Sequence, residues 1–367
     1  MKKTLITILT ALTFSVCAQE TAYTITGTID IPELEGKPAV LGRWSDREKI
    51  DTVVIANGTF KFIGNIEQPT YYWISINPED RNNNIVVNLI LENAKISVTV
   101  DSEKNSKITG TKNNDILQNF SDAERVLSQK INDAWRASRD ARQTRDEELA
   151  KSFNEEYRKY NEELRTFKIE FAKNNINNAA GQSQLRSLLG LPLEQLKGLI
   201  VNANVATLQV PEVARVVERI EGLERTAIGQ PFTDLRMPDV NGNEIALSDF
   251  AGKGKYVLID FTATWCGPCR LGKPAMIATY NRFKDKGFEI VGVWFDNTHE
   301  AWATGMKALN MPDWPQMSDL KGWGEAAKIY GIHGIPHAVL IDPNGIIIAR
   351  GLRGDDLDKK LEEIFGN

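Results

Sequence analysis

Apolar and polar residues alternate in short runs from residue 22 to about residue 110, for example over residues 23–26, 52–55 and 96–100. Turn-forming pairs such as Asn57-Gly58 separate the runs. Alternation with a period of two is typical of strands that bury one face, and Asn-Gly favours a tight hairpin turn. We therefore predict an antiparallel β domain, a sandwich or a small barrel, over residues 19–111. Since this segment contains no Cys or His, we expect it to have a docking or structural role.

A helical region is predicted over residues 112–228. Between residues 121 and 175, 24 of 55 residues are charged, 12 of each sign, and Gly and Pro are absent. This composition favours long, solvated helices. Seven apolar residues recur at steps of three and four and therefore share one helix face: Leu149, Phe153, Tyr157, Tyr160, Leu164, Phe167 and Phe171. We expect a helical hairpin that covers the sheet, or a surface through which the chain forms a homo-oligomer.

From residue 229 onward the pattern changes to alternating strands and helices. Nearly continuous apolar runs at residues 256–261 and 288–295 are typical of buried central strands. Helices are predicted at residues 267–286 and 355–365, and a hairpin at residues 338–349 around Pro343-Asn344-Gly345. This order predicts a compact α/β domain with a mixed sheet over residues 229–367.

The charge balance argues against one class of partner. The chain of 367 residues has 44 Lys and Arg against 49 Asp and Glu, which gives a net charge of −5. Because such a chain presents no net basic field, we predict that it has no nucleic-acid partner. Three cysteines are too few for a disulfide scaffold in a chain of this length.

The N-terminus has the features of a signal for export. Lysines follow Met1, an apolar run comes next, and Ala18 ends a cleavage site of small or aliphatic residues. The apolar run is shorter than the roughly 20 residues needed to cross a bilayer. We expect residues 1–18 to be a signal peptide, so that the mature chain lies on the periplasmic side of the cell envelope. A lipoprotein anchor at Cys17 is less favoured, because Val16 is bulky where such signals have a small residue.

The sequence Cys266-Gly267-Pro268-Cys269 carries the clearest chemistry. It follows the predicted central strand and opens a predicted helix, a context in which Cys-x-x-Cys indicates a redox-active dithiol. We expect Cys266 to be the nucleophile, because the unpaired N–H groups and the dipole of a helix N-terminus favour a thiolate. Cys269, one turn further on, would resolve a mixed disulfide. A purely structural disulfide is the less favoured alternative, because so small a ring is strained and easily reduced.

Residues 229–367 resemble the thioredoxin-fold domain of thiol-disulfide oxidoreductases of the TlpA/ResA type. Asp260 stands where thioredoxins have a buried acid, Pro274 where their active-site helix is kinked, and Ile335-Pro336 where they have a cis-proline. A β-rich and helical region before such a domain resembles envelope proteins of Bacteroidota. The resemblance implies an α/β thioredoxin fold at the C-terminus, preceded by the antiparallel β domain and the helical region.

The resemblance also implies roles for individual residues. Asp260 would accept the proton of Cys269 during resolution, and the alternative is an ordinary acid at a strand end. A cis Ile335-Pro336 bond would offer a backbone edge to an extended substrate segment, with Trp265 as a further substrate-binding residue; the alternative is a trans turn proline. Three residues would shape the start of the active-site helix: Gly267, Pro268 and Pro274.

Two positions depart from the family pattern. Gly272 stands where related envelope proteins commonly have Glu, and Thr262 stands where an aromatic residue is common. Both positions bear on the redox potential and on the surface around the dithiol. Neither changes the minimal mechanism.

Two histidines raise the question of a metal. His333 and His337, with the two cysteines of the dithiol, have the composition of a zinc site. The 63 residues between Cys269 and His333 are far from the usual spacing of zinc ligands. We therefore predict no metal, and we expect His337 to shape the substrate groove or to tune Cys266.

The sequence thus predicts a thiol-disulfide oxidoreductase with no cofactor other than its own Cys266–Cys269 disulfide. Its expected partners are disulfide-containing exported proteins and a membrane or envelope electron donor. The alternative is a peroxiredoxin-like thiol peroxidase, an antioxidant enzyme in which Cys266 would reduce hydroperoxides through a sulfenic acid. A third hypothesis, a binding module without catalysis, conflicts with the intact pair of cysteines.

Overall fold

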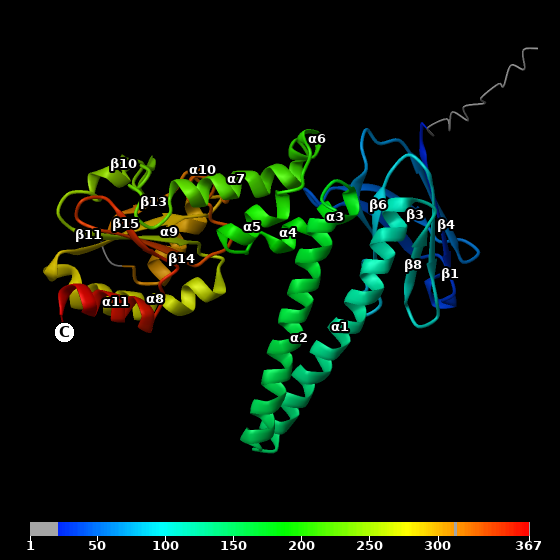
Figure 1. Ribbon diagram of the computed structural model, residues 1–367, viewed down its shortest axis with the longest axis horizontal. Helices are drawn as coiled ribbons and strands as arrows, with labels where there is room; N and C mark the ends of the chain where they lie inside the picture. Colours follow the sequence, from blue (N-terminus) through cyan, green and yellow to red (C-terminus); the bar gives the residue numbers. More distant parts are fainter. Residues whose placement is uncertain (1–20, 312–313, 367) are drawn as a thin grey trace, which may run out of the picture. The chain divides into compact units, whose positions relative to one another are not determined.

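The computed structural model describes residues 21–311 and 314–366 (Figure 1). The chain divides into two compact units, one that ends at Ser183 and one that begins at Gln184. Each unit has its own apolar core. The predicted signal peptide, including Cys17, lies outside the described residues.

The first unit begins with a β-sandwich. One sheet has the strand order β4 (Thr59–Gly64), β1 (Tyr23–Ile29), β7 (Lys95–Val100) and β8 (Ser106–Thr109); the other has the order β3 (Lys49–Val54), β2 (Pro38–Arg43), β5 (Thr70–Ile76) and β6 (Ile85–Leu91). A 3-10 turn, η1 (Pro32–Leu34), precedes β2. Both sheets contribute alternate side chains to one core, among them Ile25 and Phe62 from the first and Ile74 and Leu89 from the second. The β domain is therefore present as predicted, although β1 and β7 pair in parallel.

A long helical hairpin follows the sandwich in the first unit (Figure 1). It consists of α1 (Lys112–Gln143) and α2 (Glu147–Asn174), and the short helix α3 (Ala179–Gln182) comes next. The side chains of Thr111 and Asp146 cap the first two helices by accepting hydrogen bonds from backbone N–H groups. The centre of the Phe120 ring on α1 lies 5.1 Å from the ring centre of Phe167 and 4.2 Å from that of Phe171. The C-terminal end of the predicted apolar face thus packs within the hairpin.

The remaining helices of the predicted helical region belong to the second unit. They are α4 (Leu185–Leu188), α5 (Leu193–Ile200), α6 (Val205–Leu208) and α7 (Pro211–Arg225). Helix α7 approaches the C-terminal domain closely at Gly222, where an added Cβ would lie 2.4 Å from the carbonyl oxygen of Lys328. The predicted single helical region over residues 112–228 is therefore shared between the two units. The reason is that α7 packs against the C-terminal domain.

The second unit is built on a five-stranded mixed sheet. Its strand order is β13 (Gln316–Met317), β12 (Phe288–Trp294), β11 (Tyr256–Thr262), β14 (His337–Ile341) and β15 (Ile347–Arg350). The central strand β11 runs parallel to β12 and antiparallel to β14. A separate two-stranded sheet consists of β9 (Arg236–Pro238) and β10 (Glu244–Ala246), and η2 (Leu247–Asp249) follows it.

Helices cover both faces of this sheet, because its central strands are apolar on both sides. Side chains of α8 (Gly267–Phe283) and α11 (Asp355–Phe365) share one core with Leu258 and Leu340. Residues of α10 (Glu325–Ile329) share the core on the other face with Ile259 and Val339. The remaining elements are η3 (Lys284–Lys286) and α9 (His299–Ala308). This is the predicted thioredoxin fold, with its strands and helices close to the predicted positions. None of the helices in the described part of the chain is long and apolar enough to span a membrane.

Candidate active site

The two cysteines form a disulfide at the start of α8. The S–S distance between Cys266 and Cys269 is 2.05 Å. Cys266 is the N-cap residue of the helix, and its Sγ accepts a hydrogen bond from the backbone N–H of Cys269 at 3.2 Å. In the reduced protein the same N–H and the helix dipole would stabilise a thiolate at this position. Both residues are largely buried, Cys266 with 6% and Cys269 with 3% of its surface exposed.

A buried ion pair lies one helical turn beyond the disulfide. Asp260 on β11 is 1% exposed and Lys273 on α8 is 2% exposed. The Lys273 ammonium donates a hydrogen bond to the Asp260 carboxylate and also lies 5.3 Å from the centre of the Trp294 ring. The predicted buried acid is therefore present, but it is accompanied by Lys273, which was not among the predicted site residues.

The position of Lys273 could have been found from the sequence. It lies four residues after Cys269 on a predicted helix, and residues four apart occupy the same helix face. A lysine on the same face as a buried cysteine requires a buried counter-charge. Asp260 on the adjacent predicted strand is the nearest candidate in the sequence pattern.

A cavity of about 200 Å³ joins these groups. Asp260, Cys269, Lys273 and Pro336 all line it. Thr262 lines the same cavity, and its buried Oγ1 has no hydrogen-bond partner within the described residues. The polar groups of Asp260, Thr262 and Lys273 and this volume allow the cavity to hold water, which could carry a proton between Cys269 and Asp260.

The Ile335–Pro336 peptide bond is cis, as predicted. Strand β14 starts at the next residue, His337, which pairs with Phe261 near the end of β11. This pairing brings the cis-proline to the same end of the sheet as the start of α8. Ile335 packs against the core that contains both cysteines. The guanidinium of Arg353 donates a hydrogen bond to the carbonyl oxygen of Pro336.

Aromatic side chains form the surface next to Cys266. Trp265 is 54% exposed, and its Nε1 donates a hydrogen bond to the carbonyl oxygen of Phe295 at 3.1 Å. The centre of its ring is 6.5 Å from that of Trp323, which in turn is 5.1 Å from that of Phe295. Trp265 was a predicted site residue, whereas Trp323 was not.

The two histidines near the cis-proline are held neutral. Although His333 is exposed on one side, desolvation of its buried part, and after it the charge of Arg219, lowers its pKa to about 4. Burial, and after it the charges of Arg350 and Arg353, lowers the pKa of His337 to about 3. The Nε2 atom of His337 is buried without a hydrogen-bond partner in the described part of the chain. Within the same part, no three His, Cys, Asp or Glu side chains cluster so as to hold a metal ion. The absence of a metal stays a prediction.

The structural residues of the active-site helix lie where they were expected. Gly267 and Pro268 form its first turn, where a proline loses no helical hydrogen bond. Pro274 lies inside α8. Gly272 faces open space, because an added Cβ would meet no atom within 4 Å. A side chain therefore fits at Gly272, the position where related proteins commonly have Glu.

Comparison with known proteins identifies the second unit. Residues 228–350 match the AhpC/TSA family. The thiol-disulfide oxidoreductase ResA of Bacillus thuringiensis is 36% identical over 140 residues, which are 38% of this chain and 78% of the relative. The chain belongs to the ResA family of thiol-disulfide oxidoreductases. ResA of Bacillus subtilis is 32% identical over 127 residues, 35% of this chain and 68% of the relative. The thioredoxin domain of a thiol-disulfide oxidoreductase from Bacteroides vulgatus is 40% identical, covers 38% of this chain and 98% of its own, and has a TM-score of 0.35.

The relationship to ResA confirms the predicted activity class. The chain is a thioredoxin-like thiol-disulfide oxidoreductase, and the peroxidase alternative has less support. The match to ResA covers 38% of the chain. Residues 23–117 match a domain of unknown function, DUF4369, which leaves the role of the β-sandwich open to proposal.

Proposed function

We propose that the chain reduces disulfide bonds in exported proteins, with Cys266 as the attacking and Cys269 as the resolving cysteine. The observation that carries the proposal is the disulfide at the N-terminus of α8, with the Cys269 N–H directed at Cys266 Sγ. In the reduced enzyme, the same N–H stabilises the Cys266 thiolate and so prepares it for attack.

The reaction transfers two electrons in two exchange steps. The Cys266 thiolate attacks one sulfur of the substrate disulfide, forms a mixed disulfide and releases the first substrate thiolate. The Cys269 thiolate then attacks Cys266 Sγ, which releases the second substrate thiolate and forms the Cys266–Cys269 disulfide. The substrate is reduced and the enzyme is oxidised. A dithiol donor in the membrane or envelope restores the reduced enzyme by the reverse exchange.

Asp260 accepts the proton that Cys269 loses before resolution. Both residues line the same cavity, so the proton moves between them through water held there. Lys273 keeps the Asp260 carboxylate in place through its hydrogen bond. The ammonium also provides positive charge near the forming Cys269 thiolate.

The substrate segment binds between the cis-proline loop and the exposed tryptophan. The backbone edge at Ile335 and Pro336 pairs with an extended chain, and Trp265 provides an apolar contact next to Cys266. Backbone pairing depends little on sequence, so this part of the groove accepts many substrates.

The reaction takes place on the periplasmic side of the cell envelope. The basic and apolar start of the chain and the cleavage pattern at Ala18 support export, and Cys17 offers the less favoured lipoprotein anchor. The β-sandwich and the helical hairpin serve docking, anchoring or assembly, because their sequences carry no reactive pattern.

Reduction of insulin by the full chain, with dithiothreitol as the electron source, tests the proposal. We expect turnover by the wild type and none by Cys266→Ser. Turnover of hydroperoxide without turnover of insulin would overturn the proposal in favour of the peroxidase.

A further inference from the structure

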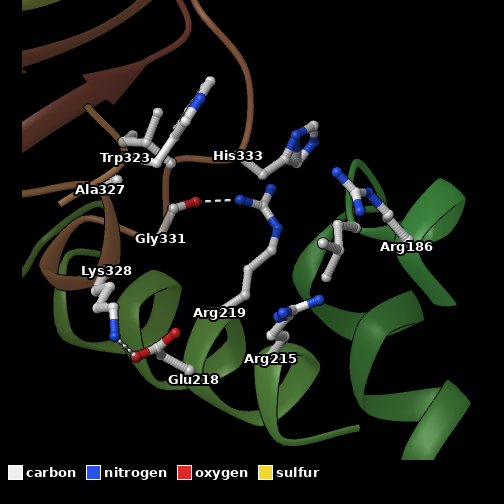
Figure 2. A pocket seen from close by; sticks show the side chains of 11 residues that line it. Arg186, Arg215, Glu218, Arg219, Trp323, Ala327, Lys328, Gly331 and His333 are labelled. Carbon is white, nitrogen blue, oxygen red and sulfur yellow. Dashed lines mark hydrogen bonds and ion pairs between the residues drawn. The ribbon is translucent and has the colours of Figure 1, made fainter. Parts of the chain in front are cut away.

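A basic pocket that the exchange reaction does not use opens in the second unit, with a volume of about 590 Å³. Arg186 of α4 and Arg215 and Arg219 of α7 line one side of it. Trp323 and His333 of the thioredoxin fold line the other (Figure 2). We call it the arginine pocket. Its arginines come from helices that precede the thioredoxin domain.

The charges of the arginine pocket are not balanced by its own residues. Glu218 is the single carboxylate among the described lining residues, and it pairs with Lys328 at a distance of 3.0 Å (Figure 2). The lining therefore offers no further carboxylate to Arg215 and Arg219. A concentration of positive charge is notable in a chain whose net charge is −5. An anionic group would complete the pocket.

Arg219 shows the imbalance most clearly. Its Nη1 donates a hydrogen bond to the carbonyl oxygen of Gly331, a neutral acceptor, and its buried Nε has no partner in the described part of the chain. The neighbouring Arg350 also bonds only neutral oxygens among the contacts described, those of Thr226 and Tyr330. Burial, and after it the charge of Arg350, lowers the pKa of Arg219 to about 10. A partly buried cation without a counter-charge is costly, and a bound anion would remove that cost.

The arginine pocket lies near two parts of the active site, the residue before Cys266 and the cis-proline loop. Trp323 in its wall lies 6.5 Å, ring centre to ring centre, from Trp265, which directly precedes Cys266. His333 lies three residues before Pro336 in the chain. Since even a fully extended chain advances only about 3.3 Å per residue, His333 lies at most about 10 Å along the chain from Pro336. A substrate segment paired with the cis-proline loop would therefore carry its next few residues to the pocket.

We propose that the arginine pocket binds the carboxylate of an Asp or Glu located two to four residues from the substrate cysteine that Cys266 attacks. The proposal rests on the proposed disulfide reduction and specifies its substrates as disulfides with acidic neighbours. Arg215 is exposed and makes the first contact, since a guanidinium binds a carboxylate through two parallel hydrogen bonds. Arg219, deeper in the pocket, supplies the second cation.

The test compares two disulfide peptides with the full chain. The peptides are identical except that one has Asp and Glu at two to four residues from the cysteine, and the other has Asn and Gln. We expect kcat/KM for reduction to be about tenfold higher for the acidic peptide. The ratio should fall as salt is added, because salt screens exposed charges. Equal kcat/KM values at low salt would overturn the proposal.

Neutral hydroxyethyl disulfide separates this inference from the proposed function. If the full chain reduces neither hydroxyethyl disulfide nor the peptides, the proposed reduction itself fails. If it reduces hydroxyethyl disulfide and shows no preference between the peptides, only the role of the arginine pocket is overturned.

Variants on α7 show whether the pocket causes the preference. Arg215→Gln should lower the ratio of kcat/KM values to between about one and three. Arg215→Lys should give an intermediate ratio, because lysine keeps the positive charge but cannot donate two parallel hydrogen bonds to a carboxylate as a guanidinium does. Arg225→Gln, an exposed change on the same helix outside the pocket lining, should leave the tenfold ratio unchanged. Loss of preference in Arg225→Gln to the same degree as in Arg215→Gln would contradict the proposal.

A free anion is the competing source of the carboxylate. Titration calorimetry with glutarate, on wild type and on Arg215→Gln, measures this directly. The pocket would be a site for small anions if wild type binds glutarate, Arg215→Gln does not, and the enzyme shows no preference between the peptides. This result would overturn the proposal that the pocket binds a carboxylate of the substrate.

Discussion

The ammonium of Lys273 forms an ion pair with the carboxylate of Asp260 inside the thioredoxin domain, one helical turn beyond Cys269. Removing one partner of a buried pair leaves an uncompensated charge, whereas removing both leaves none. The stability of the domain therefore depends on both partners of this pair.

We expect Lys273→Met to lower the free energy of unfolding by about 3–5 kcal/mol. The reason is that Asp260 would remain buried without its cation. The double variant Asp260→Asn, Lys273→Met should lose clearly less than the sum of the single changes. Urea denaturation at pH 7 measures both effects, and Lys253→Met provides an exposed control. Additive losses would show that the two side chains are not coupled.

The two cysteines should differ when each is replaced by serine. Cys269→Ser should still attack substrates and then remain attached to them, because no second thiol resolves the mixed disulfide. Cys266→Ser should form no such adducts. Expression in cells followed by non-reducing gels and mass spectrometry detects the adducts and identifies the substrates. Adducts on Cys269 in the Cys266→Ser protein would reverse the assignment.

Stability should fall as the pH decreases from about 6.5 toward 4. The pKa of His337 is about 3 in the folded protein, below its ordinary value of 6.5, so the unfolded chain binds more protons in this range. The stabilisation from neutral His337 is complete above pH 6.5 and decreases by up to about 1.4 kcal/mol per pH unit below it.

Urea denaturation between pH 4 and pH 8 tests this contribution. His337→Gln, which stays neutral, should reduce the slope of the free energy of unfolding against pH. The more exposed His333 should contribute in the same direction but less, because water screens it. An unchanged slope in His337→Gln would assign the pH dependence to other groups.

Two fragments test whether the thioredoxin domain is active by itself and whether helices α4–α7 stabilise it. A fragment of residues 184–367 should unfold cooperatively and reduce insulin, because it keeps α7 packed against the C-terminal domain. A fragment of residues 229–367 contains the dithiol, Asp260 and the cis-proline and should also reduce insulin, but at a lower Tm. Thermal unfolding followed by circular dichroism compares them. Equal Tm values would mean that α4–α7 add no stability.

Export predicts a defined N-terminus. Mass spectrometry of envelope protein should find a chain that begins at Gln19, or at an acylated Cys17 if the protein is a lipoprotein. A chain in the cytosol that still begins at Met1 would overturn the expected compartment and, with it, the class of exported substrates.

Features that depend on a local pattern could be predicted without a structure. Period-two alternation predicted the β domain, and Cys-x-x-Cys between a strand and a helix predicted the dithiol at the start of α8. The resemblance to thioredoxins implied a buried acid at Asp260 and a cis Ile335-Pro336 bond, and both are present. These features could be predicted because each follows from a short segment or from a resemblance in spacing.

Contacts between residues far apart in the chain follow only from the folded structure. One example is Arg215 and Arg219 of α7, which line the same pocket as His333. The hydrophobic pattern of α7 predicts that one face is buried but does not say against what. Its close approach at Gly222 to the backbone of Lys328 assigns the helix to the second unit. Such contacts depend on three-dimensional packing between segments about 100 residues apart, which a periodic pattern along the chain does not encode.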